Sequence, residues 1–191
     1  MSLENILKHV NEHKNLVDSL PNESYQSLED AISKITFAIK NKNKIFWCGN
    51  GGSCAEAQHL AAEFVGRFEF DRIPLPSIAL NSDTSTLTCI SNDFGYDYVF
   101  SRQLQALGSK GDIIFVLSTS GKSKNIINVL NSAKKQDILS IGMFGDYGSP
   151  ASKICDISIN FQSKSTARIQ EMHSLFGHII CDQVEINLNL K

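Results

Sequence analysis

Five short apolar segments, separated by helix-like segments, constrain the fold of this chain most strongly. The apolar segments are Ile45–Cys48, Ser77–Leu80, Ile113–Leu117, Leu139–Phe144 and Ile157–Phe161. Helices are expected between and after them, at Ser53–Phe68, Thr84–Ser91, Tyr98–Leu107, Asn125–Lys135 and Thr166–Asn189. Strands that are apolar at nearly every position are typical of sheets buried on both faces. The pattern therefore predicts an α/β fold in which helices sandwich a five-stranded parallel sheet.

The segment before the first apolar run is predicted to be a helical appendage. Apolar residues recur at helical spacing on both sides of Pro21. We therefore expect a pair of helices in residues 1–43 and an α/β core in residues 44–191, together forming one domain. The 191 residues are enough for one hydrophobic core. Such an appendage is expected to pack against another subunit.

The overall composition disfavours several classes of partner and location. A net charge of −2 provides no basic surface for nucleic acid or for an anionic membrane. No apolar run approaches the roughly 18 residues that span a bilayer, and the N-terminus lacks a signal-peptide pattern. The five cysteines are an odd number without C-x-x-C spacing, which favours reduced thiols over a disulfide framework. We expect a cytoplasmic protein with no membrane or nucleic-acid partner.

A glycine-rich turn, Gly49-Asn50-Gly51-Gly52-Ser53, follows the first apolar run directly. It joins a predicted strand to a predicted helix, where unpaired N–H groups and the helix dipole favour an anion. Two nucleotide motifs fail here. Cys54 stands where a dinucleotide fingerprint needs its third glycine, and Val116 stands where a P-loop ending at residues 121–123 needs its first.

A second polar loop, Ser118-Thr119-Ser120-Gly121-Lys122-Ser123, follows the third apolar run. Its hydroxyl and N–H groups are suited to donate hydrogen bonds to phosphate oxygens. Taken alone, the loop is explained slightly better as a serine-rich helix cap. Parallel strands end at one edge of the sheet, however, and ligands bind there where the strand order reverses. The glycine turn, this hydroxyl loop and residues 81–85 together therefore predict a phosphate site.

His59 and Glu63 lie four residues apart on the predicted helix that follows the glycine turn. This spacing places both side chains on one face of the helix, one turn apart. The pair is either a surface hydrogen bond between neighbouring turns or a site for a metal or a substrate. Mostly apolar neighbours favour the site, because burying a carboxylate and an imidazole is costly otherwise.

The last predicted helix carries Gln170 and His178 on a stripe of mainly small residues. Eight residues of helix separate them by about 12 Å along the axis. Both side chains reach one ion only if they lean towards each other or come from different subunits. His173 lies well off the direction of His178, and we expect it to be structural or exposed.

Five motifs then occur in a fixed order. They are Gly49–Ser53, Gln58–Phe64 (QHLAAEF), Asn92–Gly95 (NDFG), Ser118–Gly121 (STSG), and Arg168–Glu171 (RIQE) with His178. In this order and spacing they resemble the phosphoheptose isomerases, which are sedoheptulose 7-phosphate isomerases with the sugar isomerase (SIS) fold. The resemblance covers essentially the whole chain, including the helical appendage. Lys122 stands where many members carry a neutral residue, and Cys54 follows the glycine turn, but neither difference removes a functional group.

The resemblance implies a flavodoxin-like SIS fold and an aldose–ketose isomerisation. Sedoheptulose 7-phosphate would become D-glycero-D-manno-heptose 7-phosphate through an enediol, as the first step towards activated heptose for lipopolysaccharide or capsule. It further implies a homotetramer with active sites at subunit interfaces and one zinc ion per subunit. The residues matching the family's zinc ligands are His59, Glu63, Gln170 and His178.

Acid/base chemistry between C1 and C2 suits a carboxylate and an imidazole, which we assign to Glu63 and His178. Zinc would polarise the carbonyl oxygen. The residues expected to bind substrate are Asn50, Gly51, Gly52, Ser53, Glu63, Asn92, Asp93, Ser118, Thr119, Ser120, Ser123 and Gln170.

Two alternative functions stay open at this point. Some proteins of this fold bind phosphosugars as regulators, or are tetrameric partners of a replication initiator, without isomerase chemistry. Those proteins lack the full metal and acid/base set, so the presence of all four residues favours the enzyme. The second alternative is an isomerase of hexose or pentose phosphates, because the sequence does not reveal the length of the sugar pocket.

Overall fold

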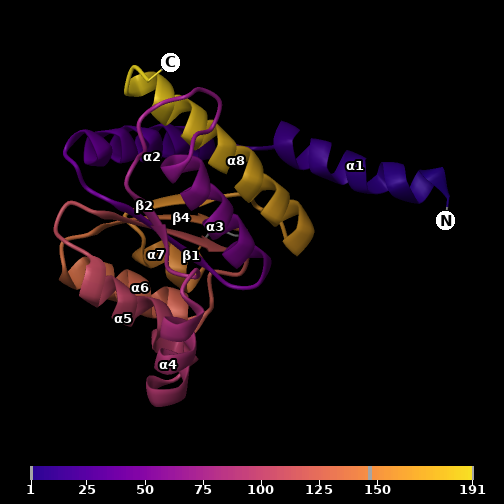
Figure 1. Cartoon of the computed structure of the whole chain (residues 1–191). Helices are drawn as coiled ribbons and strands as arrows, with labels where there is room; N and C mark the ends of the chain where they lie inside the picture. The colour runs from indigo at the N-terminus through magenta and orange to yellow at the C-terminus, as the bar shows by residue number, and fades with distance from the viewer. Residues whose placement is uncertain (1, 146–147, 191) are drawn as a thin grey trace.

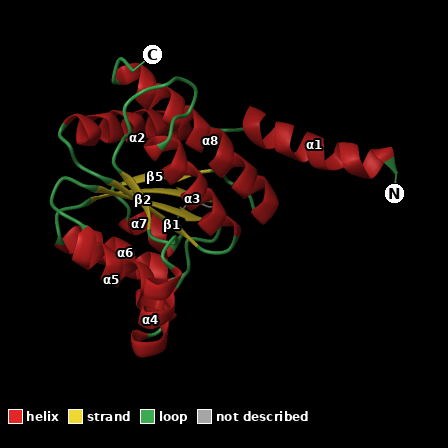
Figure 2. Ribbon diagram, in the orientation of Figure 1, coloured by secondary structure: helices red, strands yellow, loops and turns green. Residues whose placement is uncertain are grey.

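The computed structural model describes residues 2–145 and 148–190 and has a five-stranded sheet at its centre (Figures 1 and 2). Its strands are β1 (Ile45–Gly49), β2 (Ser77–Ala79), β3 (Ile113–Ser118), β4 (Leu139–Phe144) and β5 (Ile157–Asn160). All neighbouring strands pair in parallel, in the order β2-β1-β3-β4-β5. The prediction of a parallel sheet is therefore confirmed.

Helices cover both faces of this sheet, because successive side chains of a buried strand point to opposite sides. Ile45 and Trp47 of β1 belong to one core cluster and Phe46 and Cys48 to the other. The first cluster includes residues of α2 (Asn22–Lys40), α3 (Gly52–Val65) and α8 (Thr166–Asn187). The second includes residues of α4 (Thr84–Phe94), α5 (Val99–Leu107), α6 (Lys124–Lys135) and α7 (Pro150–Ile154).

The N-terminal helix α1 (Leu3–Asp18) extends away from the body of the molecule (Figure 1). None of its residues is buried, and an apolar stripe on it is exposed to solvent. Two contacts join the middle of α1 to α8. Arg168 donates a hydrogen bond to the His9 carbonyl, and His13 Nδ1 lies 2.7 Å from Oε2 of Glu171. The two predicted N-terminal helices are present, but only α1 is an appendage, because α2 packs into the core cluster on one face of the sheet. The exposed stripe consists of Leu3, Ile6, Leu7 and Val10.

Some element boundaries differ from the prediction for local reasons. Helix α3 ends at Val65 instead of Phe68, because the Arg72 guanidinium donates hydrogen bonds to the carbonyls of Glu63, Phe64 and Gly66. The short helix α7 was missed. It begins with Pro150 directly after the N-cap Ser149, a combination that favours a helix start.

The cysteines are all free, and none of the helices in the described residues is long and apolar enough to cross a membrane. Cys48 and Cys181 are buried, Cys54 and Cys155 are partly buried, and Cys89 is exposed. Burial raises the pKa of the Cys48 and Cys181 thiols above the ordinary range, so these two act as packing residues.

The carboxyl ends of β1 and β3 lie side by side where the strand order reverses. From β1 the chain crosses to β2 at one side and then passes to β3 at the other. Ligands of doubly wound sheets bind in the crevice outside such a switch point. The glycine turn after β1 and the hydroxyl loop after β3 both leave the sheet there, as the sequence predicts.

Candidate active site

The glycine turn is closely packed against α8. Gly51 adopts a positive φ of 57° and caps α3 without a side-chain hydrogen bond. A Cβ at Gly52 would lie 2.5 Å from Nε2 of Gln170, so only glycine permits Gln170 to lie against the turn. The turn therefore places a helix N-terminus beside the amide of a predicted site residue.

Asn50 connects the two loops of the switch point. Asn50 and Asn125, a buried residue in the first turn of α6, exchange two amide hydrogen bonds of 2.9 Å each. The Tyr96 hydroxyl donates a third bond of 3.0 Å to Oδ1 of Asn50, and burial raises the pKa of Tyr96, which keeps this donor protonated. Sequence reasoning missed Asn125 and Tyr96, because no local pattern signals a contact over 75 or 46 residues.

The hydroxyl loop borders a cavity of about 420 Å³. Thr119, Ser120 and Lys122 line it from the loop itself. Ser118 is buried, and its Oγ accepts a hydrogen bond from the Gly121 N–H, while Oγ of Ser120 accepts one from the Lys122 N–H. These two serines thus also shape the loop. Further lining comes from Gly148, Ser149, Pro150, Ser163, Lys164, Thr166 and Ile169.

Helices α3 and α8 lie alongside each other and run in the same direction. Gly52 meets Gln170 at one level, and Ser174 Oγ donates a 2.9 Å hydrogen bond to Oε2 of Glu56 at the next. A Cβ at Gly177 would lie 2.6 Å from Leu60 Cδ2. The small residues of α8 are therefore needed for the close approach of α3.

His59 and His178 meet across this helix pair. Their Nε2 atoms lie 2.9 Å apart, and the two rings are inclined at 66°. The Phe68 ring lies on another side of His178, with its centroid 5.4 Å away. Because neutral imidazole has one donor and one acceptor nitrogen, this contact requires one ring to accept. Two imidazole nitrogens that face each other are also suited to share a cation.

Glu63 lies one turn further along α3. Its Oε1 atom is 3.9 Å from Nδ1 of His59, and its side chain is 22% exposed. Burial and, secondly, the charge of Glu63 raise the pKa of Cys181 on α8, so the carboxylate lies near that helix. The structure therefore places Glu63 and His178 each beside His59, and all three belong to the set of ligands that the family resemblance implies.

Gln170 lies apart from these three residues within one chain. It lines a cavity of about 300 Å³ that also includes Gly52, Ser53 and Glu56. Its level on α8 is that of Gly52, whereas His178 is paired with His59, seven residues further along α3. Among the described residues, no group of three or more His, Cys, Asp and Glu side chains is arranged to hold a metal ion.

Asn92 and Asp93 lie near the end of α4 and are exposed. Asn92 donates a 2.8 Å hydrogen bond to Oδ1 of Asp93. Tyr96, three residues beyond, reaches Asn50 at the switch point, so this segment borders the glycine turn. No recorded contact among the described residues joins Asn92 or Asp93 to His59, Glu63 or His178.

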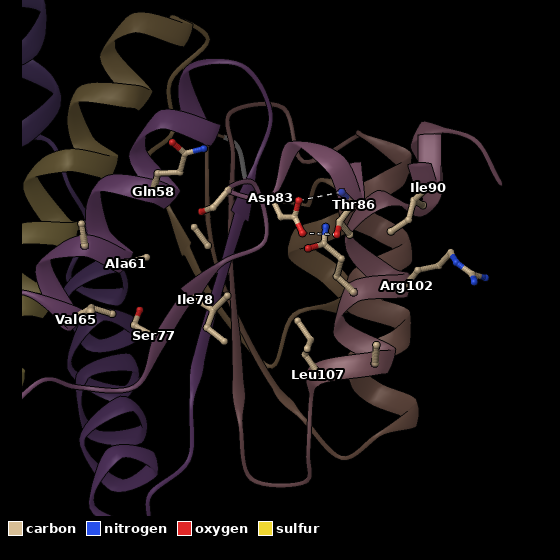
Figure 3. A pocket seen from close by; sticks show the side chains of 15 residues that line it. Gln58, Ala61, Val65, Ser77, Ile78, Asp83, Thr86, Ile90, Arg102 and Leu107 are labelled. Atoms are coloured by element: carbon tan, nitrogen blue, oxygen red, sulfur yellow. Dashed lines mark hydrogen bonds between the residues drawn. The ribbon is translucent and has the colours of Figure 1, made fainter. Parts of the chain in front are cut away.

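A cavity of about 750 Å³ lies along the edge strand β2, between α3 and α5 (Figure 3). Val65 and Ile78 line it together with Arg102 and Leu107. Its carboxylate, Asp83, caps α4, and the hydrogen bonds from Thr86 hold the pKa of that carboxyl below its ordinary value. Of the described residues that line it, only Ser82 and Asp83 belong to a segment that the sequence assigned to the site, residues 81–85.

Comparisons with a family model and with individual proteins all show similarity to SIS-domain phosphoheptose isomerases. The sequence model of the SIS domain family matches residues 8–145. The phosphoheptose isomerase of Aneurinibacillus thermoaerophilus is 47% identical over 182 residues, which cover 94% of this chain and 92% of that protein. The phosphoheptose isomerase of Campylobacter concisus is 46% identical and covers 96% of this chain and 93% of that protein.

Solved structures show the same similarity. The phosphoheptose isomerase of Francisella tularensis superimposes with a TM-score of 0.89 at 32% identity, covering 97% of this chain and 99% of that one. The phosphoheptose isomerase of Neisseria gonorrhoeae gives a TM-score of 0.86 at 37% identity, with coverages of 96% and 98%. The similarity therefore includes the helical appendage as well as the sheet.

Proposed function

The chain belongs to the phosphoheptose isomerase family of SIS-domain enzymes, and we propose that it isomerises sedoheptulose 7-phosphate at the α3–α8 helix pair. The product is D-glycero-D-manno-heptose 7-phosphate, a precursor of activated heptose. The facing imidazoles of His59 and His178, with Glu63 beside them, are the observation that most supports this site. A regulator that only binds phosphosugars has no need for such a group.

The reaction moves a carbonyl between C1 and C2, so a proton leaves one carbon and returns to the other. We assign these transfers to Glu63 and His178, a carboxylate and an imidazole on adjacent helices. The Phe68 ring packs against one side of the His178 imidazole, with its centroid 5.4 Å away. The hydroxyl loop would hold the distal phosphate, which positions C1 and C2 without taking part in the chemistry.

The donor set agrees in part with one zinc ion per subunit. Two nitrogen ligands about 2.0–2.1 Å from a tetrahedral zinc ion lie about 3.3 Å apart, close to the 2.9 Å between His59 and His178. Glu63 lies at Nδ1 of His59, on the other side of the ring from the Nε2 atom that faces His178. We propose that its side chain turns towards the two Nε2 atoms to become a further ligand. When bound, the metal would polarise the substrate carbonyl.

Gln170 completes the proposed zinc ligands only if it comes from another subunit. It lies about 12 Å from His178 along α8, with its amide packed against Gly52. We therefore propose a homotetramer with active sites at subunit interfaces, in which the exposed apolar stripe of α1 is covered by a neighbour. We place this assembly in the cytoplasm, where its free thiols stay reduced.

The direct test is to incubate the purified protein with sedoheptulose 7-phosphate and to follow the aldose product by NMR. We expect turnover by the native protein, near-complete loss in Glu63→Gln and His178→Gln, and loss on chelation. His9→Gln is the matched control, because His9 is exposed on α1 and lies outside the site. Full activity in both site variants contradicts the mechanism. Faster turnover of a hexose or pentose phosphate, or no turnover of any ketose phosphate, contradicts the substrate assignment.

A further inference from the structure

Two lysines flank the cavity at the hydroxyl loop. This cavity, of about 420 Å³, lies beyond the carboxyl ends of β3, β4 and β5. Lys122 lines it from the loop after β3, and Lys164 lines it from the segment between β5 and α8. The two residues are 42 positions apart in sequence, so the fold alone brings them to one opening. The hydroxyl groups in its lining belong to Thr119, Ser120, Ser149, Ser163 and Thr166.

Backbone hydrogen bonds between three loops hold the cavity in shape. The Gly145 N–H donates to the Thr119 carbonyl at 3.1 Å, and the Ser163 N–H donates to the Gly145 carbonyl at 2.8 Å. The Ala151 N–H donates to the Gly121 carbonyl at 3.0 Å. These bonds join the ends of adjacent strands, so an anion entering the cavity meets donors that are already in place.

The charged side chains among the described residues that line the cavity are all positive. The described residues that line it include two lysines and no carboxylate. No ion pair is recorded for Lys122 or Lys164 within the described chain, whereas the neighbouring Lys124 lies 3.7 Å from Oδ2 of Asp97. Two lysines without an ion pair to any described residue, over a cavity rich in hydroxyl groups, are suited to bind a phosphate ester.

We propose that Lys122 and Lys164 bind the phosphate group of the substrate and make the site selective for its doubly ionised form. This inference rests on the proposed function for the identity of the ester. A phosphate monoester has a second pKa near 6 and therefore carries close to two negative charges at neutral pH. The hydroxyl groups position the phosphate oxygens by hydrogen bonds but carry no charge. The two lysines neutralise the negative charge of the phosphate.

The first test measures binding of inorganic phosphate to the native protein by calorimetry, independently of turnover. Lys122→Met and Lys164→Met keep the apolar stem and remove the charge. Exposed ion pairs contribute about 0.2–1 kcal/mol each, so each change is expected to weaken binding by about threefold and the double change by about tenfold. The loss shrinks as salt is raised, because the charges are screened. Lys122→Arg and Lys164→Arg keep the positive charge and should bind phosphate like the native protein. Lys124→Met is the matched control and should leave phosphate binding unchanged.

The second test follows the kinetics of the isomerase with the same variants. The double Met variant raises KM about tenfold and leaves kcat within about twofold, because the lysines bind the part of the substrate that does not react. The native preference for pH 7.5 over pH 5.5 in KM also diminishes in this variant. An unchanged KM, or a fall in kcat alone, overturns the inference. Lysine-dependent phosphate binding without turnover of any ketose phosphate contradicts the proposed function but not the anion site.

Discussion

The phosphate end and the reacting end of the candidate site are built in different ways. At the phosphate end, loops that follow three adjacent strands are joined by backbone hydrogen bonds into a cavity within one chain. At the reacting end, the functional side chains project from two helices, and the His59 side chain is 44% exposed. Gln170 lies on another level of α8. One chain therefore forms the cavity that we propose for the phosphate, but it does not bring Gln170 to the two histidines of the proposed reacting end.

This difference separates substrate binding from chemistry in a way that mutations can test. Changes at the loops are expected to act on KM, and changes at the helix pair on kcat. We expect the largest effects from changes to residues that act across two subunits. We expect the smallest effects from changes to the amide pair between Asn50 and Asn125.

Complementation between subunits is the strongest test of the comparison. Gln170→Ala and His178→Gln are each expected to abolish turnover. If Gln170 acts in a neighbour's site, unfolding and refolding the two variants together recovers about a quarter of the native activity, from random pairing of intact halves. Activity is measured on the refolded oligomers after size separation has removed monomers and aggregates. Recovery of nothing contradicts a shared site, and phosphate binding should be native in both variants throughout.

The buried ion pair at the end of the helix pair is the next test. Arg72 Nε lies 2.7 Å from Oε1 of Glu185, with both side chains at most 2% exposed, and Glu185 also accepts from the Phe68 N–H. Arg72→Met leaves Glu185 buried and uncompensated, so the free energy of unfolding should fall by about 3–5 kcal/mol. Urea unfolding measures this loss.

Arg72 also binds the carbonyls of Phe64 and Gly66, so its loss is expected to loosen the segment that places Phe68 beside His178. At a temperature where the Arg72→Met protein is still folded, kcat should therefore fall while phosphate affinity stays native. Arg67→Met is the matched control, because Arg67 is exposed and donates to the Glu69 carbonyl only two residues away. An equal effect on kcat and phosphate affinity would remove the distinction between the two ends.

The strand and helix pattern of this chain could be predicted from local sequence because the strands are apolar and short. The switch point followed from the order of those elements, and the motifs placed Glu63 beside His59. The 2.9 Å contact between His59 and His178 joins residues 119 positions apart, and only the parallel packing of α3 on α8 creates it.

Other features could not be predicted for the same physical reason. The residues around Asn125 form no pattern that indicates a functional role. Its side-chain amide nevertheless makes two hydrogen bonds with the amide of Asn50. The C-terminal end of α3 depends on Arg72, which lies outside the helix and binds its last carbonyls. Lys122 and Lys164 line the same cavity only because the fold places the ends of β3 and β5 close together.

His173, on the same helix as Gln170 and His178, provides a smaller, pH-dependent test of stability. This side chain is fully buried against Phe161, and burial lowers its pKa to about 3. Unfolded histidine has a pKa near 6.5, so the unfolded state binds more protons and stability falls as the pH drops below about 6.5. The loss attributable to His173 is about 2 kcal/mol between pH 7 and pH 5. His173→Leu should remove that part of the slope in urea unfolding, and an unchanged slope would contradict a neutral buried imidazole.

The amide pair between Asn50 and Asn125 is expected to give the smallest effect, and it tests whether the two loops act as one unit. Asn125→Ala leaves Asn50 without two of its hydrogen bonds, and the unmade bonds cost about 1–3 kcal/mol of stability if water does not replace them. Because Asn125 lies just after the hydroxyl loop, its loss should raise KM and weaken phosphate binding slightly while kcat stays native. Asn128→Ala is the matched control, since Asn128 lies one turn later on α6 and donates to the Asp97 carbonyl. A fall in kcat with native KM would place the amide pair with the reacting end.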